Sequence, residues 1–269
     1  MMAALVLARH SLRRSRALLL VMLGVLVVFE VALVAAAGTL HESGAFSSFA
    51  ALVPSFMREM FGESLLVLLS FTGVVALGYF HPVIIAALAA LTIAIATEPV
   101  GEIETRFLDA VLARPVRRAA VLGRSALLLA LVPAFVIAVM LAATWLGLRL
   151  LAPYGVAVPA LLILSLGANL WALLLCLGGV ALAVGAAARR RSTAAGLVGV
   201  VALALFLVEY VARIWKPAVS MARLSPFHYY DAMAMVMGRP LPAVHVEVLL
   251  FVAVSGGAVA FVLFSRRDL

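Results

Sequence analysis

The chain lacks residues that several common activities require. Its 269 residues include one cysteine, Cys176, so an intrachain disulfide is excluded. They include one lysine, Lys216, which is followed by Pro217. A phosphate-binding loop of the form Gly-x-x-x-x-Gly-Lys-[Ser/Thr] needs a lysine that reaches the nucleotide phosphates. This chain therefore does not hydrolyse ATP by that chemistry, and we expect it to be neither an ATPase nor another enzyme.

Charge is scarce as well. Only 12% of the residues are charged, whereas an ordinary soluble domain has roughly 25%. Apolar residues make up 67% of the chain, and its mean hydropathy is +1.23. Apolar runs of about 20 residues, the length that spans a bilayer, recur from end to end. The composition predicts an all-α, polytopic membrane protein with six transmembrane helices.

The basic residues that are present explain the net charge of +8 without a nucleic-acid partner. Fourteen of the 20 lie in four short segments, at residues 9–16, 106–124, 189–191 and 266–267. Such asymmetry is typical of loops that remain in the cytoplasm. We expect a multi-pass protein of the cell membrane with both termini in the cytoplasm.

The apolar runs predict where the chain crosses the membrane. The six spans are expected at 17–37, 82–99, 119–148, 158–187, 193–213 and 245–264. Residues 1–16 place arginines on one helical face, which predicts an amphipathic helix lying on the membrane surface. Residues 214–244 form the longest external loop.

The apolar stretch 64–97 is too long for one ordinary span, and His81-Pro82 interrupts it. Proline removes a backbone donor and disfavours helix at the residue before it. We therefore expect residues 64–80 to form a re-entrant or outer-leaflet segment that precedes the second span.

One segment, Glu98 to Arg118, is densely charged, with four acidic and four basic side chains. Within it, Ile103, Phe107 and Val111 recur at helical spacing and form one apolar stripe. Glu102 and Arg106 lie four residues apart on the opposite side, in the favourable order for an ion pair. The pattern predicts a short amphipathic helix over 101–115 with a charged face turned to water. An ordinary loop between two helices is an equally good interpretation of the periodicity alone.

The segment "GEIETRFLDAVLARPVRR" resembles the region after the second helix in permeases of type 2 ATP-binding-cassette (ABC) exporters. The matching residues are Gly101, Glu102, Ile103, Glu104, Leu108, Asp109, Leu112, Ala113, Arg114, Pro115 and Arg118. The family's Gly-Thr pair is replaced by Arg106-Phe107. "HP" at 81–82, "LSPFHYY" at 224–230 and the terminal "FSRRDL" at 264–269 are also similar to that family.

The resemblance implies a function and a set of partners. Residues 101–115 would be the coupling helix that docks into a separate ATPase subunit. A homodimer of this chain would assemble with two such subunits. ATP and Mg²⁺ would be bound there, with no cofactor in this chain. The complex would export a small hydrophobic or amphiphilic substrate, such as a drug or a lipid.

Two intramembrane carboxylates, Glu30 and Glu209, leave another hypothesis open. Ionisable groups within spans are typical of proton relays, so a proton-coupled secondary transporter is the alternative function. In an exporter the same two residues would either pack against neighbouring helices or form an acidic ring in the substrate path.

Metal chemistry has weaker support in the sequence. Met233, Met235 and Met237 alternate near His228, and thioether sulfur suits Cu(I). These side chains would converge only on an extended strand, and methionine commonly fills apolar surface. The five histidines form no His-Glu-x-x-His motif, so we expect neither a metal site nor an intramembrane metalloenzyme.

Overall fold

A computed structural model describes residues 2–52, 54, 67–105, 118–212 and 215–266, and every regular element in these ranges is helical. Six helical stretches are long and apolar enough to cross a membrane, at 16–42, 71–96, 120–151, 160–187, 191–212 and 243–265. The protein is therefore a multi-pass membrane protein of all-helical fold, as the composition predicts.

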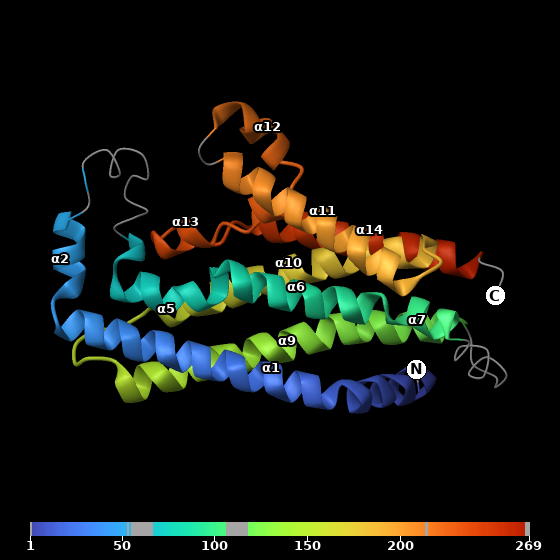
Figure 1. Cartoon of the computed structure of the whole chain (residues 1–269), viewed down its shortest axis with the longest axis horizontal. Helices are drawn as coiled ribbons and strands as arrows, with labels where there is room; N and C mark the ends of the chain where they lie inside the picture. The colour runs from blue at the N-terminus through green and yellow to red at the C-terminus, as the bar shows by residue number, and fades with distance from the viewer. Residues whose placement is uncertain (1, 53, 55–66, 106–117, 213–214, 267–269) are drawn as a thin grey trace.

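The long helices run roughly along one axis, and α2 stands across it (Figure 1). The long ones are α1 (Met2–Glu42), α9 (Arg118–Leu151), α10 (Ala160–Ala187), α11 (Arg191–Ala212) and α14 (Ala243–Ser265). The shorter ones are α2 (Ala45–Leu52), α5 (Phe71–Phe80), α6 (Pro82–Ala96), α7 (Glu98–Glu104), α12 (Val219–Ala222) and α13 (Ala232–Val236), with 3-10 turns η1 (Lys216–Ala218) and η2 (Pro226–Tyr229). Both termini and α7 lie at one end, called here the α7 end, and α2 and α13 lie toward the opposite, α13 end.

Helix α10 forms the centre of the bundle. In the most apolar part of α10, 56% of the residues are buried inside the protein. The corresponding share is only 17% in α1, α11 and α14. The closest approach joins α10 to α14, where Gly179 lies against the backbone of Ala253 and Gly256 against that of Gly179. A Cβ atom at either glycine would collide with the facing backbone. Small residues are what allow membrane helices to pack this closely.

The first helix differs from the prediction. α1 is continuous from Met2 to Glu42, so no break separates a surface helix at 1–16 from a span at 17–37. At 1.5 Å per residue, 41 residues extend about 60 Å, roughly twice the thickness of the hydrocarbon core. The exposed Arg13 and Arg16 therefore lie about three and four turns into the same helix that forms the span.

The second span also differs. α5 runs into α6 in nearly the same direction (Figure 1), and the two form one candidate span, Phe71–Ala96. The described residues 67–80 therefore show no reversal of the chain before α6, and the expected outer-leaflet position of this segment stays a prediction. The proline interrupts the hydrogen bonding without reversing the chain, because His81 ends one helix and caps the next.

The segment between α11 and α14, predicted as an external loop, packs against the bundle. Phe227 and Tyr230 are buried, and so are Met235 and Val236 in α13. Ser225 is fully buried, and its Oγ donates to the carbonyl of Leu205 in α11 at 3.0 Å. We call residues 215–242 the outer segment.

Candidate functional site

The second span carries two breaks, each at an X-Pro step, and each break is held by polar side chains. The first lies between α5 and α6 at His81-Pro82. The second lies between α6 and α7, where Thr97 ends one helix and Pro99 stands in the first turn of the next. Proline is tolerated in a first turn because its missing donor would be unsatisfied there anyway.

At the α7 end, Glu102 forms a two-pronged ion pair with Arg124 of α9. Arg124 Nη1 donates to Oε1 at 2.7 Å, and Nη2 donates to Oε2 at 2.9 Å. The Arg124 side chain is 2% exposed and that of Glu102 is 11% exposed. Paired charges of this geometry are among the stronger protein hydrogen bonds. They fix α7 to the beginning of the third span.

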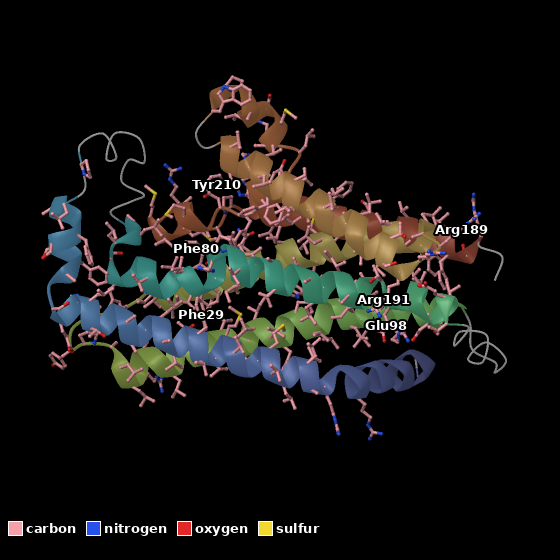
Figure 2. All side chains as sticks on the ribbon, viewed as in Figure 1. Phe29, Phe80, Glu98, Arg189, Arg191 and Tyr210 are labelled. Atoms are coloured by element: carbon pink, nitrogen blue, oxygen red, sulfur yellow. The ribbon has the colours of Figure 1, made fainter. Side chains whose placement is uncertain are left out.

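Glu104 holds the same helix to α11. Its Oε2 accepts from the backbone N–H of Arg191, the first residue of α11, at 3.1 Å. The Arg191 guanidinium turns back and donates to the carbonyl of Ala94 in α6 at 3.0 Å. Gly101 permits this, because a Cβ there would lie 2.8 Å from Arg191 Cδ. Figure 2 shows Arg191 and Glu98 together at this end.

These contacts change the interpretation of the charged segment. The sequence places Glu102 on a water-facing side with Arg106, whereas the Glu102 carboxylate turns inward to Arg124. Ile103 packs partly buried against the core, as the apolar stripe predicts. The remaining predicted docking residues lie outside the described part of the chain: Arg106, Phe107, Leu108, Asp109, Leu112, Arg114 and Pro115.

The α5–α6 break is arranged differently, around backbone groups. In a continuous helix the Val83 N–H would bond to the carbonyl of Tyr79. Here it bonds instead to Nδ1 of His81 at 3.3 Å. The freed Tyr79 carbonyl accepts from the hydroxyl of Tyr230, in the outer segment, at 2.8 Å. Burial raises the pKa of the Tyr230 phenol, so it remains a protonated donor.

Glu30 lies beside this break and is fully buried between α1, α5 and α9. Thr144 of α9 donates to its Oε2 at 2.9 Å, and the Tyr79 hydroxyl lies 3.0 Å from the same threonine oxygen. Gly78 makes room for the carboxylate, because a Cβ there would collide with it. In this conformation the Glu30 carboxylate is enclosed by helices. The sequence leaves two roles open for it, packing against neighbouring helices or lining a substrate path, and this arrangement corresponds to the first.

Glu209 occupies a separate site at the end of α11. Its Oε2 lies 3.3 Å from Nδ1 of His228, and its side chain is 14% exposed. The His228 ring also lies near the rings of Tyr229 and of His245 in α14, with the three ring centroids 5.3–6.5 Å apart. Glu209 thus contacts His228 whereas Glu30 contacts Thr144, and the acidic ring in a substrate path stays a prediction.

Met233 and Met235 do not alternate along an extended strand, which the Cu(I) hypothesis requires. Met233 and Met235 lie in α13, which is helical, and a helix turns alternate residues to different sides. Met235 is buried in the core while Met233 is partly exposed. Among the described residues, no group of three or more His, Cys, Asp or Glu side chains is placed to hold a metal.

The sequence reasoning missed the partners of these acidic residues. The sequence pattern places Arg124 only in a basic segment, Tyr79 only in the predicted re-entrant or outer-leaflet segment, and Thr144 only in a predicted span. A signal was present in Arg124, a charged residue six positions into a predicted span, since charges within spans need partners.

No protein-family model matches the chain, and no curated protein matches its sequence. The motif resemblance therefore supports only a proposal.

Proposed function

We propose that the chain is the permease subunit of an ATP-driven exporter of the type 2 ABC kind. Two copies would form the membrane part, and two separate ATPase subunits would bind ATP and Mg²⁺ beneath it at the α7 end. The substrate class is a small hydrophobic or amphiphilic molecule. The complex would reside in the cell membrane with both termini of this chain in the cytoplasm.

The attachment of α7 is the observation that supports this proposal best. A docked ATPase must transmit its movement to the helices that line the substrate path. A coupling segment on a loose loop would absorb such movement. α7 is instead fixed to α9 through Glu102–Arg124 and to α11 through Glu104–Arg191. A force applied beside α7 therefore reaches the third and fifth spans directly.

Charge reversal at Asp109, in the charged segment that follows α7 in the sequence, tests the docking. We expect Asp109→Arg to prevent co-purification with the proposed ATPase subunit, while the permease still inserts and remains monodisperse. Glu247→Arg is the matched control, because it makes the same kind of change on an exposed residue of α14 near the other end. Glu102→Arg is less suitable, since it would face the buried Arg124 and disturb the fold itself.

The readout is nucleotide-dependent transport of an amphiphilic dye into inside-out vesicles. ATP should drive uptake in the wild type and in Glu247→Arg, and uptake should fall to background in Asp109→Arg. Unchanged assembly and transport in Asp109→Arg would show that this segment is not the dock.

The proton-coupled alternative is supported by one observation, the carboxylate of Glu30 among the hydroxyls of Tyr79 and Thr144. The same vesicle assay separates the two functions. Uptake that follows an imposed proton gradient without nucleotide, and that is lost in Glu30→Gln, would favour the secondary transporter.

A further inference from the structure

A narrow apolar crevice opens between α10, α11 and α14. Its volume is about 300 Å³. Cys176 of α10, Val201 and Leu205 of α11, and Val252 of α14 line its walls. Arg223 and Tyr229 of the outer segment line it as well. Apolar side chains from three membrane-spanning helices thus meet one cationic residue.

The surroundings determine what can fill this crevice. Its helical walls belong to spans, and the hydrocarbon layer holds no water to occupy an apolar space. The α11 wall continues into side chains that face outward, with Val201 42% exposed and Leu207 50% exposed. A hydrocarbon chain from the bilayer can therefore reach the crevice sideways.

The outer segment adds a charge where the hydrocarbon ends. Arg223 is exposed, and none of the described carboxylates forms an ion pair with it. The Tyr229 hydroxyl donates to the Arg223 carbonyl at 3.0 Å, which fixes the backbone at this position. A guanidinium binds phosphate oxygens in a two-pronged geometry. Arginine commonly extends its charge to the headgroup level while its stem covers apolar surface.

The volume limits the size of the occupant. About 300 Å³ is the lower limit for small-molecule pockets, which range up to roughly 1,000 Å³. A space of about 300 Å³ accommodates part of one acyl tail but not two tails side by side. A phospholipid would place one tail in the crevice and leave the other in the surrounding bilayer.

We propose that this crevice binds an anionic phospholipid, with one acyl chain between α10, α11 and α14 and its phosphate on Arg223. The lipid joins the outer segment to α11 and α14 and stabilises the packing of that segment. This site is independent of nucleotide and of the ATPase partner, so it goes beyond the proposed transport function.

Lipid retention tests the proposal directly. The full-length protein is purified in a mild detergent and incubated with phosphatidylglycerol or with phosphatidylcholine that carries identical chains. Bound lipid is then counted by native mass spectrometry. The wild type should retain phosphatidylglycerol at least tenfold better than phosphatidylcholine.

Two variants separate the headgroup from the tail. Arg223→Gln should lower phosphatidylglycerol retention at least fivefold and leave phosphatidylcholine unchanged. Val201→Trp fills the crevice and should abolish retention of both lipids. Arg149→Gln is the control, because Arg149 is an exposed arginine at the end of α9, away from the crevice; it should behave as the wild type.

A photoactivatable phosphatidylglycerol provides a measurement on the wild type that does not depend on any variant folding. Its tail should cross-link to peptides containing Cys176 or Val201. Cross-links elsewhere, or equal retention by wild type and Arg223→Gln, would overturn the proposal. So would a Val201→Trp protein that keeps its lipid but changes from dimer to monomer, since the crevice would then be an interface between two copies.

Discussion

Two helix breaks, one within the second span and one at its end, interrupt the backbone hydrogen bonding, and the two are stabilised by different kinds of polar contact. At the α7 end, where the chain leaves the apolar layer, the break is held by ionised side chains, Glu102 with Arg124 and Glu104 with the start of α11. At the α5–α6 break, inside the span, the freed Tyr79 carbonyl accepts from the Tyr230 hydroxyl, and the Glu30 carboxylate beside it accepts from the Thr144 hydroxyl and forms no ion pair with another described residue.

The difference follows from the cost of charge at each depth. An ion pair near the membrane surface can be partly hydrated, whereas a charge at the bilayer centre costs roughly 2.5–3.5 kcal/mol on insertion scales. Hydroxyls satisfy freed backbone groups without that cost. One contact can therefore be removed at the α5–α6 break with little effect, while removing half of an ion pair at the α7 end leaves a charge without its partner.

The largest effect is expected from Arg124→Gln. It leaves the Glu102 carboxylate, 11% exposed, without its counter-ion, and breaking a buried pair on one side costs about 3 kcal/mol or more. Thermal unfolding in detergent should show a clear loss of stability. The exchanged pair Glu102→Arg with Arg124→Glu should recover part of it. If the exchanged pair is no better than the single variant, the ion pair is not what stabilises α7.

A smaller effect is expected where Gly78 faces Glu30. Gly78→Ala introduces a Cβ that collides with the carboxylate, and overpacking of this kind costs about 1–3 kcal/mol. In a Glu30→Ala background the same substitution should cost much less, because the colliding atoms are gone. The four proteins form a double-mutant cycle measured by thermal unfolding. Additive losses would show that Gly78 and Glu30 do not meet.

Single hydroxyl deletions at the α5–α6 break should cost less again. Tyr230→Phe removes the donor to the Tyr79 carbonyl, and Thr144→Val removes the donor to Glu30. Hydrogen bonds between membrane helices average about 0.6 kcal/mol, with a maximum near 1.7 kcal/mol. Unfolding midpoints should therefore shift less than for Arg124→Gln. An equal or larger shift would contradict the comparison between the two breaks.

The smallest effect on stability is expected from single cysteine substitutions, which test the side of the membrane on which each end of the bundle lies. Single cysteines in a Cys176→Ala background at Ser43 and Ser220 should react with an impermeant thiol reagent from outside, and those at Ser192 and Ser265 only from inside. All four serines are exposed. A cysteine at Ser225 should react slowly from either side, because that position is fully buried against Leu205. Labelling of residue 192 from outside would reverse the topology.

Periodicity was sufficient for the spans that are plain apolar helices. The predicted ranges 119–148, 158–187, 193–213 and 245–264 each agree with α9, α10, α11 or α14 to within a few residues. Their ends are marked by arginine clusters, prolines and glycines that act locally. At 1–16 and 64–80 the helix boundaries differ from the predicted ones. The hydrophobic pattern at 1–16 is the same whether a surface helix turns into the span or one helix runs straight on. At His81-Pro82 the pattern is likewise the same whether the chain reverses or continues with a small offset.

The sequence by itself determined the class of this protein, because six apolar runs and the scarcity of charge leave no alternative to membrane spans. It also marked the positions that matter, His81-Pro82, the 98–118 segment and "LSPFHYY", without showing how they are related. Only the tertiary structure joined Tyr79 to Tyr230, and Glu102 to Arg124. These contacts link residues 151 and 22 positions apart. Local patterns do not encode them, because a polar group inside a membrane protein takes whichever partner the packing of other helices brings within reach.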